Sequence, residues 1–179
     1  MRTAAAVSIL GLALAALATS AVAADWKTYA DDRRGWSISY PADFKVDRSY
    51  RYEIITPSPA GVSFAVPRSM TRGTNLNEAS LSVERLPGRN CRPAQFVDDP
   101  QDVATVRADG RMYIKATGSD AGMSQYRDTT LFLVKGTCTA VRYFTHSTNP
   151  GVMDPPPRAF DAARLTRLFD RMRATLVLN

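Results

Sequence analysis

Residues 103–117 read VATVRADGRMYIKAT, and this stretch decides the fold class. Two runs suited to β-strands, residues 103–108 and 111–117, flank the pair Asp109-Gly110. An Asp-Gly pair between two such runs is a strong signal for a β-hairpin, because both central positions of the tight turn need a positive φ. Hairpins join antiparallel strands, so the stretch predicts an antiparallel sheet.

Further strands are expected on both sides of this hairpin. Downstream, residues 126–134 and 137–146 form a second pair around Lys135-Gly136. Upstream, apolar residues recur with period two, which is typical of strands buried on one face. This pattern predicts strands at residues 36–41, 50–56, 62–66 and 79–83. Short helical turns are expected within residues 24–34 and 92–97, and the small and polar residues 118–124 are expected to form a loop.

The last segment of the chain predicts the only long helix. Its apolar residues recur at the spacing of one helix face, and they are Leu165, Leu168, Phe169, Met172 and Leu176. Asp154 is the expected N-cap of this helix. The sequence therefore predicts an α+β fold, in which an antiparallel sheet of about six to eight strands packs against a long C-terminal helix and short helices.

Residues 1–23 have the order of a secretory signal peptide. Arg2 is followed by an apolar run over residues 4–18 and then by the small triplet at residues 21–23. Cleavage after this triplet would leave residues 24–179 as one periplasmic or secreted domain. The run is short for a membrane span, although an uncleaved anchor is the alternative. No Cys follows the cleavage site, so a lipoprotein is not expected, and no other stretch is apolar enough to cross a membrane.

Composition and net charge further limit the class of protein and its expected partners. The chain of 179 residues is 45% hydrophobic and 22% charged, which excludes collagen, coiled coils and wholesale disorder. Arg2 is the only charged residue of the signal segment, so its removal lowers the net charge from +6 to +5. A basic exported protein is suited to contact anionic envelope components, and a merely solubilising charge is the alternative. Nucleic acid is not an expected partner, because no basic run has interleaved aromatic residues.

Residues 35–46, GWSISYPADFKV, resemble the opening of PsbP-like domains, with a glycine, an aromatic residue, an alternating strand and then Tyr40-Pro41. Residues 137–178 are similar to the end of a group of uncharacterised bacterial exported proteins. The resemblance implies an α-β-α sandwich and a binding or assembly role. It implies no catalytic residues and, without a photosynthetic context, no photosystem role.

Cys91 and Cys138 are the only cysteines. In an oxidising compartment two cysteines tend to pair, and loop closure would then stabilise the fold by roughly 4 kcal/mol. Free thiols are the alternative. A catalytic thiol is poorly supported, because the chain has no CxxC motif and only one histidine.

His146 is the only histidine, and strand alternation places it on the face of Ala140, Arg142 and Phe144. With Asp128 or Asp161 it would form the site of a small periplasmic hydrolase or transferase, which is the alternative function. The other interpretation is a hydrogen-bonded histidine that fixes the proline-rich connector. No cofactor or metal site is expected, because the acidic pairs lack the spacing of a calcium loop.

Arg164, Arg167 and Arg171 form a basic stripe on the predicted terminal helix. The stripe is a candidate binding face, and the alternative is the solvated back of an amphipathic helix. Together these observations predict an exported soluble domain with a non-enzymatic binding or assembly role. Its expected partner is an unknown protein or an anionic component of the envelope.

Overall fold

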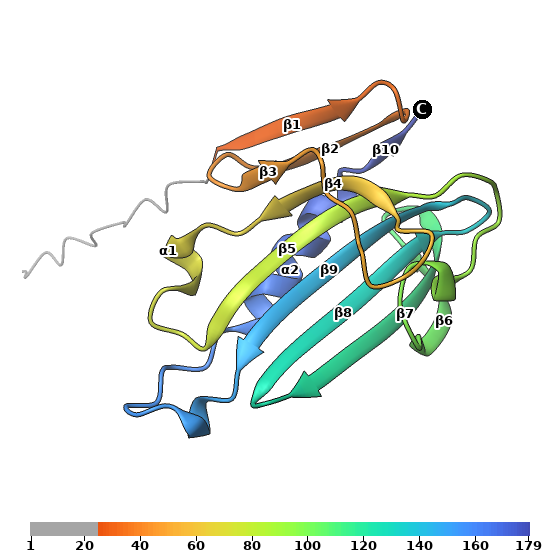
Figure 1. Cartoon of the computed structure of the whole chain (residues 1–179). Coiled ribbons are helices and arrows are strands. Elements are labelled where there is room, and N and C mark those ends of the chain that lie inside the picture. The colour runs from red at the N-terminus through yellow and green to blue at the C-terminus, as the bar shows by residue number, and fades with distance from the viewer. Residues whose placement is uncertain (1–24) are drawn as a thin grey trace, which may run out of the picture.

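The computed structural model describes residues 25–179 and consists of two antiparallel sheets and one long helix (Figure 1). The predicted signal peptide lies outside the described residues. The strands are β1 (Trp26–Asp31), β2 (Trp36–Pro41), β3 (Lys45–Asp47), β4 (Ala60–Ala65), β5 (Leu76–Arg85), β6 (Gln101–Ala108), β7 (Arg111–Gly122), β8 (Gln125–Val134), β9 (Thr139–Thr148) and β10 (Val177–Leu178). The helices are α1 (Arg68–Thr71), α2 (Ala162–Ala174) and the one-turn 3₁₀ helices η1 (Pro93–Gln95) and η2 (Pro150–Val152).

The larger sheet has seven strands in the order β3-β4-β5-β9-β8-β7-β6, and each recorded neighbour pair is antiparallel. The smaller sheet has the order β1-β2-β10 and lies beside the β3–β4 side of the larger one (Figure 1). The predicted α+β class and sheet of about six to eight strands are confirmed. The smaller sheet was not predicted, because it pairs β2 with two residues that follow α2 at the far end of the chain.

The hairpin at Asp109-Gly110 is confirmed, with φ values of 53° and 72° at the two turn positions. The loop expected at residues 118–124 is wrong, because β7 continues to Gly122 and turns only at Met123-Ser124. Pairing with β8 outweighs the small-residue composition there. Gly118 also serves packing, since a Cβ at this position would lie 2.6 Å from Val97 Cγ1.

Three other local predictions are wrong. Residues 26–31 form β1 rather than a helical turn, because they pair along the whole of β2. Residues 50–56 form no strand and make only the isolated bridge Arg51↔Ala60, while the short β3 precedes them. The cap of α2 is Asp161 rather than Asp154, because the helix begins at Ala162 and the Asp161 carboxylate accepts a hydrogen bond from the Arg164 N–H at 2.8 Å.

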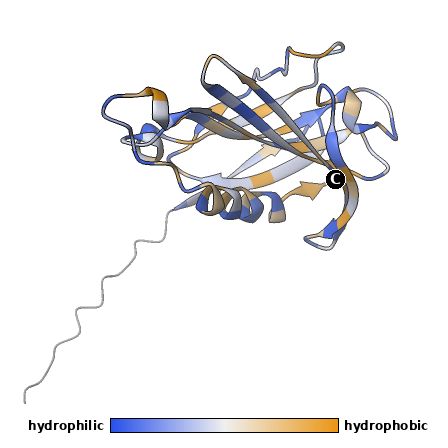
Figure 2. Ribbon diagram, turned by 90° about the horizontal axis from the view of Figure 1, so that it is seen from below, coloured by the Kyte–Doolittle hydropathy of each residue, from blue (hydrophilic) through white to orange (hydrophobic). Residues whose placement is uncertain are grey.

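One face of the larger sheet is covered by α2 and the smaller sheet. The predicted apolar stripe of α2 lies inward, with Leu165, Phe169 and Met172 buried in the same core as Trp36 and Ile38 of β2. Figure 2 shows α2 lying along the strands, with hydrophobic and hydrophilic residues alternating around it. Burial of this stripe is the main force that holds the helix on the sheet.

The opposite face of the sheet carries a second, smaller core, which includes Phe96, Val97, Leu131 and Leu133. The connection from β5 to β6, including the predicted short helix η1, covers this core. A disulfide joins Cys91 in that connection to Cys138 beside β9, with an S–S distance of 2.02 Å, which confirms the predicted pairing. Among the residues that the structure describes, no helix has the length and apolar character that a membrane span requires.

Candidate functional site

The structure does not bring the three residues of the alternative enzyme site together. His146 lies opposite Arg127 and Glu78 in the strand register, whereas Asp128 lies opposite Thr145. Successive residues of a strand point to opposite faces, so His146 and Asp128 are on different sides of the sheet. Asp161 is occupied as the N-cap of α2.

The histidine itself is bonded to an amide. His146 Nε2 lies 3.0 Å from Gln125 Oε1, and Asn77 donates to the same oxygen. Within residues 25–179, no ion pair joins His146 to a carboxylate. A general base needs an orienting group and a nucleophile in reach, and this arrangement supplies an amide network instead.

The basic stripe of α2 is exposed as the helix pattern predicts. Arg164 and Arg167 are exposed, and the Arg171 guanidinium lies 5.0 Å from the centre of the Trp26 ring. The stripe is therefore an exposed charged surface, with one arginine held against an aromatic residue of β1.

A different cluster of arginines lines a cavity, which we call the arginine groove. This open cavity of about 580 Å³ lies between the β1–β2 turn, the β3–β4 connection and the end of β5. Its lining contains no acidic residue and consists of Arg33, Arg34, Arg51, Pro57, Ser58, Ala60, Arg85, Leu86 and Pro87. Four arginines around one cavity make it a site suited to anions.

The sheet register explains the shape of the groove. Arg51 bridges Ala60, and Ala60 is the β4 partner of Arg85, so the three residues form one row across neighbouring strands. Directly opposed residues share a face, and adjacent strands are about 4.8 Å apart, which separates the two arginine backbones by about 10 Å. The methyl group of Ala60 leaves an open notch between them.

Most of the charge in the groove is uncompensated. Arg34 forms an ion pair of 2.6 Å with Asp31, and the Arg85 guanidinium donates to the Arg34 carbonyl oxygen at 2.5 Å. Arg33, Arg51 and Arg85 form no ion pair with a carboxylate within residues 25–179. Three positive charges are thus available to a ligand.

A buried ion pair supports the groove from beneath. Glu84 and Arg142 are both fully buried, and their side chains form two hydrogen bonds of 2.6 and 2.8 Å. The same guanidinium donates to the Phe96 carbonyl oxygen and lies 3.6 Å from the centre of the Tyr52 ring. Because Glu84 precedes Arg85 and Tyr52 follows Arg51, this network holds the backbone on both sides of the notch.

The titration of these buried groups follows their surroundings. Burial opposes the charge on Arg142, but the charge and hydrogen bonds of Glu84, together with Tyr50 and Tyr52, outweigh burial and raise the pKa of Arg142 above its usual value. Burial, with help from the Glu84 charge, raises the pKa of Tyr50. Arg142 therefore stays charged and Tyr50 stays neutral at neutral pH, so these two groups give the groove a fixed support there.

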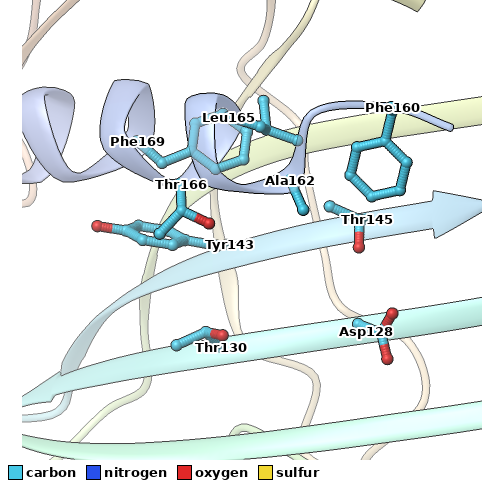
Figure 3. Close-up of a pocket in the computed structure, with 9 residues that line it drawn as sticks. All are labelled: Asp128, Thr130, Tyr143, Thr145, Phe160, Ala162, Leu165, Thr166 and Phe169. Atoms are coloured by element: carbon cyan, nitrogen blue, oxygen red, sulfur yellow. The ribbon is translucent and has the colours of Figure 1, made fainter. Parts of the chain in front are cut away.

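A second and smaller cavity, the seam pocket, lies between α2 and the strands β8 and β9 (Figure 3). It has a volume of about 200 Å³ and is lined by Asp128, Thr130, Tyr143, Thr145, Phe160, Ala162, Leu165, Thr166 and Phe169. Of the predicted site residues, only Asp128 lines this pocket. The Asp128 carboxylate accepts a hydrogen bond of 2.8 Å from the Ser119 hydroxyl.

Comparisons with solved structures give distant likenesses. No protein-family model and no curated protein sequence matches the chain. A protein of Bacteroides thetaiotaomicron VPI-5482 aligns with 12% identity and a TM-score of 0.48 over 86% of this chain and 48% of its own, so this chain spans about half of that protein. Cyanobacterial PsbP (CyanoP) from Synechocystis sp. PCC 6803 aligns with 10% identity and a TM-score of 0.45, over 89% of this chain and 96% of its own.

Neither TM-score reaches 0.5, so the fold class rests on the strands and helices described above. The resemblance to PsbP-like domains stays a prediction about the family.

Proposed function

We propose that residues 24–179 form an exported, non-enzymatic binding domain that takes an anionic group of the cell envelope in the arginine groove. The observation that carries the proposal is the set of three arginines without carboxylate partners around one open cavity. A protein surface that gathers such charges without pairing them gains little stability from doing so, because like charges repel. An anionic ligand would remove that repulsion.

The chemistry of the groove favours oxyanions. A guanidinium presents several N–H donors in a planar fork, which matches a carboxylate or a phosphate with two parallel hydrogen bonds. Arg51 and Arg85 stand on either side of Ala60, so one oxyanion in the notch is within reach of both side chains. The buried pair below them limits backbone movement, which lowers the entropy lost on binding.

Export rests on the sequence of the first 23 residues and is supported by the disulfide. Disulfides persist in oxidising compartments and are rare in the cytosol. The anionic polymers and lipids of an envelope are the oxyanion-rich partners that an exported basic domain would meet.

The test is binding of disulfide-bonded residues 24–179 to phosphatidylglycerol-containing vesicles and to an anionic polysaccharide at increasing salt. The variant Arg51→Gln/Arg85→Gln removes two groove charges, and Arg164→Gln/Arg167→Gln removes two charges from α2 as the matched control. The groove variant is expected to bind at least about tenfold more weakly than the control, because charge-assisted hydrogen bonds contribute about 1.5–3 kcal/mol each.

Two results would contradict the proposal. Equal losses in both variants would mean that net charge, and not the groove, attracts the anion. Affinity that does not fall with rising salt would exclude an electrostatic contact. Comparison of the two anions then shows whether the lipid headgroup or the polymer is preferred.

A further inference from the structure

The seam pocket differs from the arginine groove in charge and in shape. Two cross-strand pairs form its sheet side, because Asp128 lies opposite Thr145 and Thr130 lies opposite Tyr143. Directly opposed residues point to the same face, and Figure 3 shows these four side chains gathered below the start of α2. The register of β8 and β9 therefore builds one wall of the pocket.

The other wall comes from the segment around the start of α2 and is apolar except for Thr166. Phe160, Leu165 and Phe169 face the sheet across the cavity, and the Phe169 ring lies 5.3 Å from the Tyr143 ring, centre to centre (Figure 3). The aromatic rings of this wall offer an apolar surface for the hydrocarbon part of a ligand. Drug-sized sites usually exceed 300 Å³, so a pocket of about 200 Å³ admits only a compact molecule.

The polar groups of the pocket share one character: they can accept hydrogen bonds. Asp128 is the only ionisable carboxylate in the lining, and no Lys or Arg lines the pocket. Asp128 Oδ1 accepts a hydrogen bond from the Ser119 hydroxyl, and within residues 25–179 no group donates a hydrogen bond to Asp128 Oδ2. The Tyr143 hydroxyl is occupied because it donates to Asp170 at 2.9 Å.

The threonines complete this set. The side chains of Thr130, Thr145 and Thr166 line the same cavity from two strands and the helix. Hydroxyls and a carboxylate around an aromatic surface are complementary to a cation with N–H donors, and an aromatic face also attracts a cation. A carboxylate or phosphate would meet Asp128 without any positive charge in the lining to offset the repulsion.

We propose that the seam pocket binds a small molecule that carries a protonated amine on a compact apolar or aromatic body. The ammonium group pairs with Asp128 and donates to the threonine hydroxyls, while the body lies against Phe160 and Phe169. This site is independent of the arginine groove and does not require anion binding.

The probe is phenethylamine hydrochloride, titrated into isotopically labelled, disulfide-bonded residues 24–179 and followed by NMR chemical shifts. Phenethyl alcohol and phenylacetate are the comparison ligands, because they keep the body and change the head group to neutral or anionic. The shifts are expected at Asp128, Thr130, Thr145 and Thr166. The amine is expected to bind most tightly and phenylacetate most weakly.

The variant Asp128→Asn is expected to weaken amine binding by up to about fivefold, because Asp128 is exposed and an exposed charge pair contributes no more than about 1 kcal/mol, and to leave binding of the alcohol unchanged. Asp120→Asn is the matched control, since Asp120 lies on the same hairpin opposite Arg127, is exposed and does not line the pocket. Ala162→Phe fills the cavity from the helix and is expected to abolish binding of both ligands.

Three outcomes would overturn the proposal: phenylacetate binding as tightly as the amine, equal affinities in the Asp128 and Asp120 variants, or full binding in the Ala162→Phe variant. The Arg51→Gln/Arg85→Gln variant is expected to keep amine binding. Loss of anion binding in that variant with amine binding retained would show that the two sites are separate.

Discussion

At the scale of single residues, two arginines carry charge into the interior. Arg142 is fully buried and is matched by Glu84, while Arg173 pairs with Asp109 at 2.9 Å and lies 4.0 Å from the centre of the Phe132 ring. Burying an ion costs several kcal/mol, so each arginine depends on its carboxylate and on the aromatic rings beside it. Replacing only the carboxylate of such a pair should therefore lower the free energy of unfolding.

Glu84→Gln is expected to destabilise the fold by about 3–5 kcal/mol, because it leaves the Arg142 charge buried without a counter-charge. Urea unfolding of the variant measures the change. Asp120→Asn serves as the comparison, since it breaks an exposed ion pair with Arg127 of 3.7 Å and is expected to cost no more than about 1 kcal/mol. Similar unfolding midpoints for the two variants would contradict the account of the buried pair.

Tyr143 makes the stability sensitive to alkali. Burial is the main cause that raises the pKa of Tyr143 above its usual value of 10.0. Its contribution to stability is therefore fully present below about pH 10 and is lost as the pH rises further, because the unfolded chain releases the proton first.

Wild type and Tyr143→Phe are to be compared by urea unfolding between about pH 8 and pH 11. The wild type is expected to lose more stability above pH 10 than the variant, which retains the ring and lacks the ionisable hydroxyl. Parallel pH profiles for the two proteins would show that Tyr143 ionises as readily in the folded state as in the unfolded chain.

At the scale of elements, sequence patterns predicted correctly those turns and helices that depend on residues close together in the chain. The Asp109-Gly110 turn and the apolar stripe of α2 were predicted correctly, since each depends on residues that are close in the sequence. The strand β1 was missed because Trp26 and Tyr29 have helical spacing, and only pairing with β2 makes that segment extended. The extension of β7 beyond Thr117 was missed for the same reason, because it depends on β8.

Gly110→Ala tests the hairpin turn. The residue has a φ of 72°, and a Cβ there would meet nothing within 4 Å, so the expected cost is backbone strain alone, about 1–2 kcal/mol. Gly122→Ala is the matched control, because that glycine also has open space and its φ lies outside the left-handed region. Thermal unfolding of both variants measures the difference, and an equal loss would mean that the turn carries no strain.

At the scale of the whole molecule, the candidate site was predicted least well. The four groove arginines lie between residues 33 and 85 with no common motif, and the row Arg51–Ala60–Arg85 exists only once the strands pair. The basic stripe on α2 could be predicted from the sequence, because the residues of one helix face recur at a regular spacing within a single segment. His146 and Asp128 looked like partners in the sequence, yet the pairing of β8 with β9 places them on opposite faces.

The disulfide ties the covering connection of the second core to the sheet. Its cysteines are 47 residues apart, and a loop of that length gives a stabilisation of about 4 kcal/mol from the reduced entropy of the unfolded chain. Reduction with dithiothreitol is expected to lower the free energy of unfolding by about this amount, as measured with urea. Cys91→Ser/Cys138→Ser provides the control, because dithiothreitol should not change its stability; a shift there would reveal an effect unrelated to the disulfide.

Export is the prediction on which the assignment to the envelope depends. Expression of the full chain in a bacterium, followed by fractionation and intact-mass measurement, is expected to give a periplasmic product that begins at Ala24. That product should be two hydrogens lighter than its reduced form, because Cys91 and Cys138 are joined. A variant with Leu12→Arg and Leu14→Arg interrupts the apolar run and should retain the chain inside the cell with free thiols, since translocation needs an apolar segment. A wild-type product that begins at Met1, stays in the cytosol and carries two free thiols would remove the envelope as the source of the ligand, while the anion chemistry of the arginine groove would still be tested by the binding experiment.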